Sequence, residues 1–167
     1  MASQPAEAHR ASVDLPSGET AGPLAALPTP RYRTALLVED EAAFRRIIAR
    51  NLASRGVEVR EAETADQAIA AGGDGRPELL LIDISLPDRS GWDVLRELRR
   101  RGIEIPTIVI SAVRFPASRL EEFRPLAYLP KPFPLEALLR LVFDSAGVKS
   151  AKTIATAAAF ETVNDLK

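Results

Sequence analysis

Cysteine is absent from the 167-residue sequence, which excludes a disulfide framework, thiolate metal ligands and a cysteine nucleophile. A reducing cytosol is the simplest compartment for such a chain. The single histidine, His9, lies in a polar N-terminal stretch, so we interpret it as solvent-exposed and without a catalytic role. Any reactive site therefore has to be built from other side chains.

Long hydrophobic runs and an excess of one charge are also missing. No segment resembles the apolar region of a secretory signal or reaches the length of a membrane span, so we expect a cytoplasmic protein with no membrane partner. The 22 basic and 23 acidic residues leave a formal net charge of −1, so nucleic acid is not the default partner. The arginine runs Arg45-Arg46 and Arg99 to Arg101 fall within predicted helices, where a solvated face is the usual explanation.

The sequence divides into a leader, one domain and a tail. Residues 1–30 contain five prolines and no hydrophobic period, so burial cannot offset the entropy of ordering them and we predict a disordered leader. We expect a single domain over 31–145, and a tail over 146–167 that is disordered or weakly helical.

Short apolar runs alternate with amphipathic stretches across the domain, which predicts βα units on a parallel sheet and an α/β fold. Three runs are almost entirely apolar, as central strands covered on both faces must be, and two shorter runs are typical of outer strands. The central runs are Thr34 to Val38, Leu79 to Ile82 and Thr107 to Ile110; the outer ones are Val57 to Arg60 and Leu126 to Leu129.

Helical periodicity appears between these strands. Ala42 to Ser54 carries an apolar stripe that ends before Gly56, a second helix begins after Thr64, and a third begins after Ser90. The last helix begins near Pro134. Together with a fourth segment these make about five helices.

Polar side chains follow three of the apolar strands. Glu39 and Asp40 follow the first, Asp83 follows Ile82, and Ser111 follows Ile110. Ligands of open α/β sheets gather at the carboxyl ends of strands, so we expect these residues to converge on one edge of the sheet. Taken singly, each is more often a cap or turn residue, and Lys131 between two prolines is more often a solvated lysine.

Three carboxylates brought together require compensation. At about 5 Å and an effective dielectric near 20, each ionised pair costs about 3 kcal/mol. A Mg²⁺ ion removes this penalty, and it suits one or two direct carboxylates with water and a phosphate oxygen. Phosphoryl transfer needs such a metal, donors for the remaining oxygens and a nucleophile held in line. Ser111 and Lys131 would supply the donors, and Asp83 would form the acyl phosphate.

These residues lie within four motifs that closely resemble the CheY-like receiver domain of response regulators. The motifs are Leu36 to Glu41, Leu81 to Asp88 with Ser90-Gly91, Ile110 to Ala112, and Tyr128 to Phe133. They occur in order, and the resemblance covers about Arg33 to Phe143. It implies a doubly wound, flavodoxin-like sheet of five parallel strands in the order 2-1-3-4-5.

The resemblance also implies roles for individual residues. Asp83 would be the phosphoacceptor; the Mg²⁺ ion would be held directly by Asp40, through water by Glu39, and by the backbone carbonyl of Ser85. Ser111 would follow the phosphate inward while Tyr128 fills the space, and Lys131 would bind the phosphoryl group. The bond from Lys131 to Pro132 would be cis.

The segment between Ser111 and Lys131 departs from the family pattern. It is a couple of residues short, and Pro116 and Pro125 leave at most Ala117 to Phe123 for a fourth helix, about two turns. We expect that helix to be short or irregular, and mobile before phosphorylation. The family often has a polar residue where this chain has Val113.

The resemblance implies one function for the chain, and two other functions are considered beside it. We expect a stand-alone response regulator phosphorylated by a histidine kinase or histidine phosphotransfer protein, acting as an enzyme only on itself. Its output would be a protein contact through the surface from Val113 to Phe143, with a possible homodimer on phosphorylation. A receiver-fold scaffold that works without phosphorylation is the main alternative. A metal-dependent phosphatase would need a second acid close after Asp83, where Ile84-Ser85 stand instead.

Overall fold

The computed structural model describes residues 30–143, so the predicted tail and all but the last residue of the predicted leader lie outside the described residues. Strands and helices alternate along the described part. The strands are β1 (Thr34–Val38), β2 (Glu58–Ala62), β3 (Leu79–Asp83), β4 (Thr107–Ser111) and β5 (Ala127–Pro130). The helices are α1 (Ala42–Ala53), α2 (Ala65–Gly73), α3 (Gly91–Arg100), α4 (Ala117–Phe123) and α5 (Leu135–Phe143).

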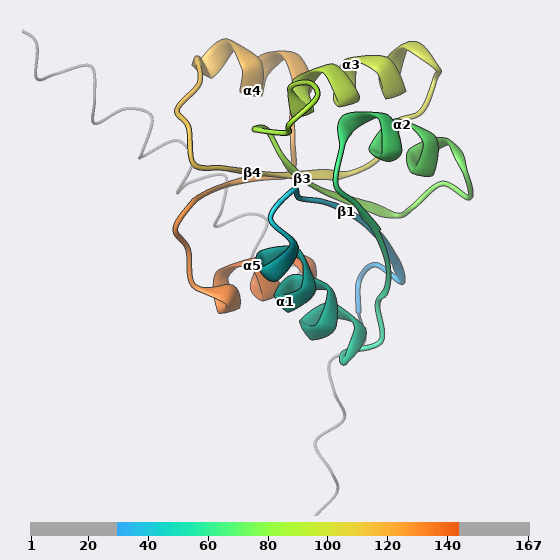
Figure 1. Cartoon of the computed structure of the whole chain (residues 1–167), viewed down its shortest axis with the longest axis vertical. Coiled ribbons are helices and arrows are strands. Elements are labelled where there is room, and N and C mark those ends of the chain that lie inside the picture. The colour runs from blue at the N-terminus through green and yellow to red at the C-terminus, as the bar shows by residue number, and fades with distance from the viewer. Residues whose placement is uncertain (1–29, 144–167) are drawn as a thin grey trace, which may run out of the picture.

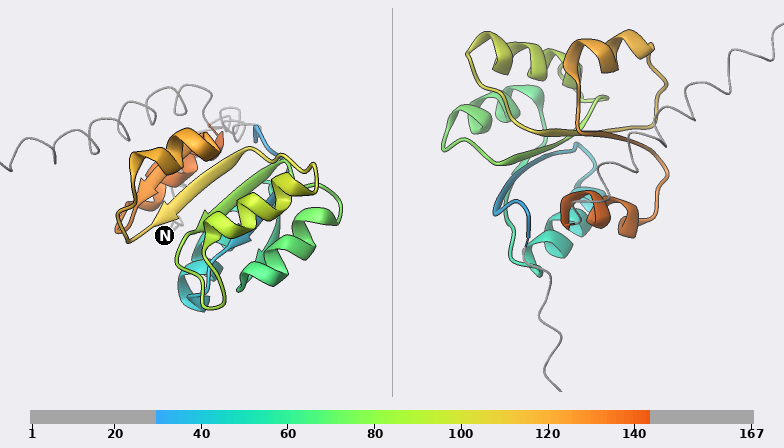
Figure 2. Two further views of the ribbon diagram at one scale, coloured as in Figure 1. Left: turned by 90° about the horizontal axis from the view of Figure 1, so that it is seen from above. Right: turned by 180° about the vertical axis from the view of Figure 1, so that it is seen from behind.

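All five strands pair in parallel, in the order β2-β1-β3-β4-β5, which confirms the predicted doubly wound sheet. The chain runs outward from β1 to β2 and then crosses back to β3 on the other side of β1. Helices α1 and α5 cover one face of the sheet, and α2, α3 and α4 cover the other (Figures 1 and 2). The point where the strand order reverses therefore lies between β1 and β3, where ligands of such sheets bind.

The central strands are buried because each of their residues packs against one helical layer. Leu37, Leu81 and Ile108 pack on the α1 and α5 side, whereas Leu36 and Val109 pack on the side of α2 to α4. This alternation follows from the two-residue period of a strand. It explains why β3 and β4 read as continuous apolar runs.

The outer strands begin one residue later than the apolar runs predicted. Strand β2 covers Glu58–Ala62 because its register with β1 runs from Thr34 opposite Glu58 to Val38 opposite Ala62. Val57 instead donates its N–H to the Leu52 carbonyl in the turn that follows α1. Backbone pairing, and not apolar character, decides where these edge strands start.

The helix starts match the predicted caps. The Thr64 hydroxyl accepts a hydrogen bond from the Gln67 N–H at 3.2 Å, and the Ser90 hydroxyl accepts one from the Trp92 N–H at 3.3 Å. Helix α4 has only seven residues, as predicted, and Arg124 after it adopts a left-handed conformation with φ of 46°. The mobility of α4 before phosphorylation stays a prediction. None of the helices in residues 30–143 is long and apolar enough to cross a membrane.

Two neighbouring isoleucines of α1 test this layer arrangement. Ile48 is 0% exposed beneath the sheet, whereas Ile47 is 52% exposed. We expect Ile48→Ala to lower the free energy of unfolding by about 2–5 kcal/mol because it leaves a cavity in the core. Ile47→Ala should change it by less than about 0.5 kcal/mol, as most surface substitutions do. Urea denaturation of both variants measures the difference, and equal losses would contradict the orientation of α1.

Candidate functional site

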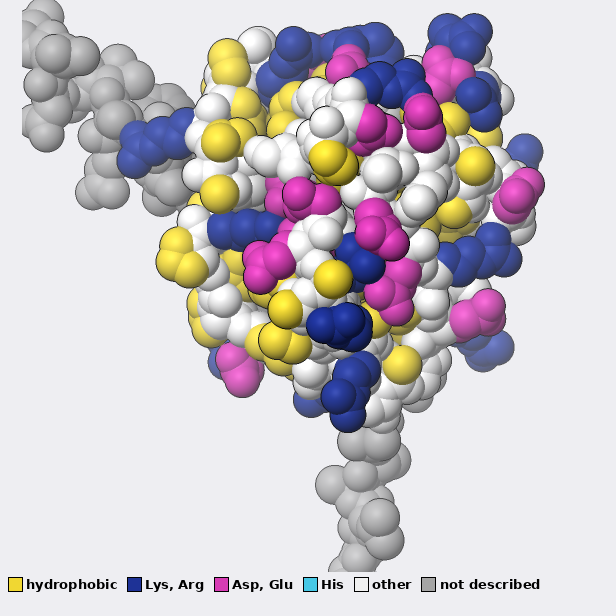
Figure 3. All heavy atoms as spheres, in the orientation of Figure 1, with side chains coloured by type: hydrophobic (Ala, Val, Ile, Leu, Met, Phe, Trp, Pro, Cys, Tyr) yellow, Lys and Arg dark blue, Asp and Glu magenta, His cyan; other side chains and the backbone are white. Residues whose placement is uncertain are grey.

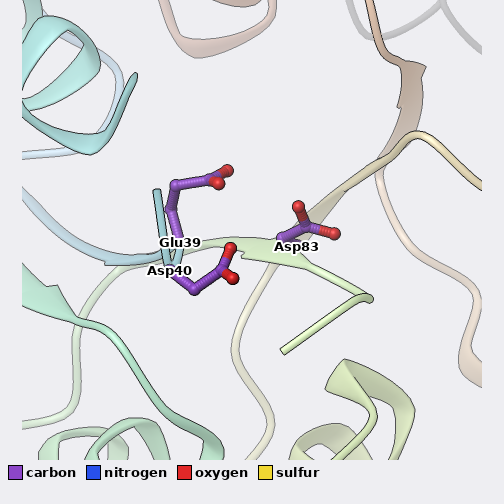
Figure 4. A group of neighbouring side chains, drawn as sticks. All are labelled: Glu39, Asp40 and Asp83. Carbon is purple, nitrogen blue, oxygen red and sulfur yellow. The ribbon is translucent and has the colours of Figure 1, made fainter. Parts of the chain in front are cut away.

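The carboxyl ends of four strands bring the candidate residues together at one edge of the sheet. Glu39 and Asp40 follow β1, Asp83 ends β3, Ser111 ends β4, and Lys131 follows β5. Single oxygen atoms of Glu39, Asp40 and Asp83 all lie within 4.8 Å of one another. Figure 4 shows the Glu39 and Asp40 side chains extending from the end of β1 toward the side where Asp83 lies. The predicted convergence of carboxylates is therefore confirmed.

The three carboxylates differ in their exposure. Glu39 is 1% exposed and Asp83 is 4% exposed, whereas Asp40 is exposed to solvent. A buried carboxylate is unfavourable unless it is paired or hydrogen-bonded. The two buried carboxylates therefore require a partner within the protein, whereas water can solvate the charge of the exposed Asp40.

Lys131 supplies that partner. Its ammonium lies 2.6 Å from Asp83 Oδ2, and 2.7 and 3.0 Å from the two carboxylate oxygens of Glu39. From the sequence, Lys131 was predicted only to bind the phosphoryl group. The structure adds a second role, because its ammonium already pairs with both buried carboxylates and joins β5 to β1 and β3.

The ionisation of this cluster follows from burial and pairing. Burial raises the pKa of Glu39, and Lys131 offsets only part of that rise while the charge of Asp83 adds to it. Burial by itself would lower the pKa of Lys131, but the hydrogen bonds and charges of Asp83 and Glu39 outweigh it, so its pKa is raised. The ammonium therefore stays protonated at neutral pH.

The Asp83 carboxylate is held at both oxygens. Oδ1 accepts a hydrogen bond from the Ser85 N–H at 2.8 Å, and Oδ2 accepts the one from Lys131. The loop that carries Ser85 is folded back on itself, since Ser85 and Ser90 form an isolated antiparallel bridge and the Gly91 N–H donates to the Ile84 carbonyl. This loop thus fixes the direction of the Asp83 side chain.

Gly91 at the start of α3 makes that loop geometry possible. A Cβ atom placed on it would lie 2.4 Å from the Asp83 carbonyl oxygen and 3.0 Å from the Ile84 Cα. No real Cβ contact is this short, and both neighbours are backbone atoms that cannot move aside easily. Only glycine therefore lets α3 begin against the end of β3.

Ser111 lies at the expected sheet edge and is fully buried. Its hydroxyl donates to the Val113 carbonyl at 3.0 Å and accepts from the Val113 N–H at 3.1 Å. Its carbonyl accepts a hydrogen bond from the Lys131 N–H at 2.8 Å. The serine therefore connects the loop after β4 directly to the residue that pairs with Asp83, and the Lys131-Pro132 bond is cis as expected.

Tyr128 belongs to a row of aromatic rings on the α3 and α4 side of the sheet. Phe115 contacts Tyr128 at 4.8 Å between ring centroids and Trp92 at 4.9 Å, and Trp92 stacks on Phe123 at 5.1 Å. Partial burial raises the pKa of Tyr128. The structure thus joins the proposed switch residue to α3 and to the end of α4.

The contacts of two charged residues near the site were not predicted from the sequence. Arg45 was assigned to a solvated face but is buried, and its guanidinium donates to the Glu39 carbonyl at 2.6 Å. Asp88 caps α2 from the loop after β3, accepting the Ala65 N–H at 2.9 Å and the Asp66 N–H at 3.1 Å. Neither contact leaves a local sequence signal, because the partners lie on other elements.

The donor set fits a hard divalent cation. All the candidate donors are oxygen atoms: three carboxylates and the Ser85 carbonyl. Mg²⁺ prefers such ligands and keeps several waters, which the exposed Asp40 side chain would allow. The residues present are therefore compatible with a Mg²⁺ site, and the net negative charge of the carboxylates favours a cation even with Lys131 nearby.

Comparisons with known proteins agree with this geometry. Residues 35–143 match the family model of the response regulator receiver domain. The response regulator MprA of Mycobacterium sp. (strain KMS) is 34% identical over 106 residues, which cover 62% of this chain and 46% of that protein. The MprA of Mycobacterium avium (strain 104) is 35% identical over 106 residues, with the same coverage. The chain thus spans about half the length of the curated relatives it matches.

Solved structures share the fold. The signal receiver domain of a LuxO repressor homologue from Vibrio parahaemolyticus superposes with a TM-score of 0.62 at 25% identity, covering 75% of this chain and 97% of that one. A response regulator from Burkholderia pseudomallei, solved with a phosphorylated aspartic acid, calcium and citrate, also gives 0.62. It is 23% identical and covers 78% of this chain and 75% of that one, so it supports the fold alone.

Glycine substitutions test the geometry around Asp83. We expect Gly91→Ala to lower the free energy of unfolding by about 1–3 kcal/mol, because the new methyl group overlaps the β3 backbone. Gly73 at the end of α2 is the matched control, since a Cβ there meets nothing within 4 Å. Gly73→Ala should leave stability unchanged or raise it by up to about 1 kcal/mol. Thermal denaturation measures both, and a harmless Gly91→Ala would contradict the close approach.

Proposed function

The chain belongs to the family of response regulator receiver domains, and from this premise we propose that it signals when Asp83 accepts a phosphoryl group. One observation carries the proposal. Asp83 is buried at the end of β3 with its carboxylate held between the Lys131 ammonium and the Ser85 N–H. This arrangement orients a nucleophile and supplies a cation beside the position that a phosphoryl group would take.

The chemistry is a transfer to the carboxylate. An oxygen of Asp83 forms a bond to phosphorus while the bond between phosphorus and the donor breaks, and the donor keeps the electron pair of the broken bond. A phosphohistidine of a histidine kinase or phosphotransfer protein is the donor we propose. The product is an acyl phosphate on Asp83. The chain then acts as an enzyme only on itself, in forming and hydrolysing this bond.

Mg²⁺ is the cofactor we propose for this step, held by Asp40, Asp83 and the Ser85 carbonyl, with Glu39 acting through water. When bound, it neutralises charge on the phosphoryl oxygens. The chain itself contributes orientation and a second cation. The Ser85 N–H holds Asp83 in place, and the loop ending at Gly91 keeps that N–H at the end of β3.

Lys131 would change partner during the reaction. In the unphosphorylated protein its ammonium pairs with both Asp83 and Glu39. Once Asp83 carries a phosphoryl group, the dianionic phosphoryl oxygens offer the ammonium a stronger partner than the uncharged carbonyl oxygen of the acyl phosphate. The lysine therefore pairs with the carboxylates before phosphorylation and binds the phosphoryl group afterwards.

The response would pass through Ser111 and Tyr128. A shift of the Ser111 hydroxyl from Val113 to the phosphoryl group would release the loop after β4. Phe115 lies in that loop against Tyr128 and Trp92, so its movement would reach α3 and α4. We propose that a downstream protein, or a second copy of the chain, reads the surface from Val113 to Phe143.

A protein is a better partner for the described surface than nucleic acid. Figure 3 shows acidic side chains among the basic ones over α3 and α4. Arg96 faces Asp93 and Glu122, and Arg100 and Arg101 bond to Glu97. The hydrogen bonds from these two arginines lower the pKa of Glu97 to about 2, so it stays charged. The paired charges weaken any positive field that would attract phosphates.

Mg²⁺ should stabilise the folded protein. Binding to the folded state alone at ten times the dissociation constant adds about 1.4 kcal/mol to the free energy of unfolding. We expect Asp40→Asn to reduce this response and to raise the stability of the metal-free protein, because one of three clustered negative charges is lost. Glu41→Gln is the control, since it removes an exposed charge outside the cluster. Melting temperatures that do not change with millimolar Mg²⁺ would argue against the site.

Phosphorylation should be direct and confined to Asp83. We expect incubation with acetyl phosphate and Mg²⁺ to add one phosphoryl group that is labile to hydroxylamine, as acyl phosphates are. Asp83→Asn should abolish the addition, whereas Asp88→Asn should keep it because Asp88 only caps α2. Intact-protein mass spectrometry measures the product. A wild-type chain that never becomes labelled, although it binds Mg²⁺, would favour a scaffold that works without phosphorylation.

A further inference from the structure

Arg45 is a buried cation for which the proposed chemistry has no use. It lies in the first turns of α1 and is 8% exposed, while its neighbour Arg46 is exposed. Its guanidinium donates through one nitrogen to the Glu39 carbonyl at 2.6 Å and, more weakly, to the Asp40 carbonyl at 3.4 Å. These two residues carry the carboxylates that follow β1.

The other side of the guanidinium contacts a different loop. Its Nε donates to a Glu61 carboxylate oxygen at 3.2 Å, and its remaining nitrogen lies 3.6 Å from the Glu63 carboxylate. Glu61 is on β2 and Glu63 begins the connection to α2. Arg45 therefore bridges the acidic loop after β1 and the end of β2, with all three of its nitrogens in contact with acceptors.

This bridge fixes the peptide group that links Glu39 to Asp40. The Glu39 N–H of the preceding peptide group donates to the Ala62 carbonyl at 3.0 Å, and the Glu39 carbonyl, which belongs to the linking peptide group, accepts from Arg45. The exposed Asp40 side chain starts from this peptide, so the direction in which it leaves the backbone depends on the bridge. The rigid guanidinium fork is suited to such a task, because its donors have fixed relative positions.

We propose that Arg45 is a positioning residue for divalent-cation binding, which holds Asp40 toward Asp83 through the backbone carbonyls. The proposal rests on the proposed function in that Mg²⁺ is the cation. Groups that orient metal ligands without touching the metal typically contribute about 10-fold to 100-fold in affinity. We therefore expect about a tenfold loss of Mg²⁺ affinity in Arg45→Gln.

The direction in which Mg²⁺ affinity changes shows whether Arg45 orients Asp40 or acts only through its charge. Removing a positive charge near a cation site strengthens cation binding if charge is all that matters, because like charges repel. Loss of orientation weakens it. Arg46→Gln is the matched control, since it removes the same charge from the next residue, where the side chain is exposed and outside the bridge.

The experiment measures Mg²⁺ affinity on the unphosphorylated full chain, by titration of Trp92 fluorescence and of amide chemical shifts. We expect Arg46→Gln to bind Mg²⁺ as tightly as the wild type or slightly more tightly, and Arg45→Gln to bind it about tenfold more weakly. Arg45→Lys should fall between them, because one ammonium group keeps the charge but cannot reach both the Glu39 carbonyl and Glu61.

A second readout uses phosphorylation by acetyl phosphate at varied Mg²⁺ concentrations. Arg45→Gln should need about ten times more Mg²⁺ for half the maximal rate, while the rate at saturating Mg²⁺ stays within about twofold of the wild type. A general loss of structure would lower that maximal rate and would not be recovered by Mg²⁺.

Several outcomes would overturn the proposal. Folded Arg45→Gln that binds Mg²⁺ as tightly as Arg46→Gln excludes a positioning role. If Arg45→Gln does not fold, Arg45→Lys decides, because unchanged affinity in that variant shows that the guanidinium fork is not needed. A wild-type chain that binds no Mg²⁺ would instead refute the metal site itself, and one that binds it without being phosphorylated would refute only the proposed function.

Discussion

The contact of the Lys131 ammonium with Asp83 and Glu39 is the interaction on which the rest of the site depends. It joins the end of β5 to the ends of the neighbouring strands β1 and β3, although β4 lies between β3 and β5 in the sheet. Without this cation, two almost fully buried carboxylates would lie close together with no opposite charge beside them, which is unfavourable. The lysine thus compensates the charge of Asp83, the nucleophile that we propose, in a place where little water reaches it.

The backbone around the lysine ties this electrostatic centre to the rest of the molecule. The Lys131 N–H donates to the Ser111 carbonyl, and the Ser111 hydroxyl holds the loop that carries Phe115. Phe115 in turn lies between Tyr128 and Trp92. A change of charge at Asp83 would therefore act on groups in direct contact, from the sheet edge to α3 and to Phe123 at the end of α4. Such contiguous contacts give a proposed switch a physical route.

Arginines complete the framework on both faces of the sheet. Arg45 of α1 donates to the carbonyls of the acidic loop, and Arg99 of α3 donates to the Glu122 and Phe123 carbonyls at the end of α4. The last carbonyls of a helix have no partners within it, so Arg99 satisfies acceptors that the short α4 leaves open. Arg45 thus joins α1 to the loop after β1, and Arg99 joins α3 to the end of α4.

Several features could be predicted from the amino-acid sequence: the order of strands and helices, the short α4, and the convergence of Glu39, Asp40, Asp83, Ser111 and Lys131. Those features follow from hydrophobic period, from proline and cap positions, from the rule that parallel strands end at one edge, and, for the strand order, from the motifs shared with a known family. The pairing of the buried charges could not be predicted in this way, because it depends on how the layers pack. These contacts join distant segments or backbone atoms: Lys131 pairs with Glu39, Arg45 donates to the acidic loop, and the Gly91 backbone lies against the Asp83 carbonyl. Their geometry depends on where each side chain points once the layers have packed, and no local pattern of residue types encodes that direction.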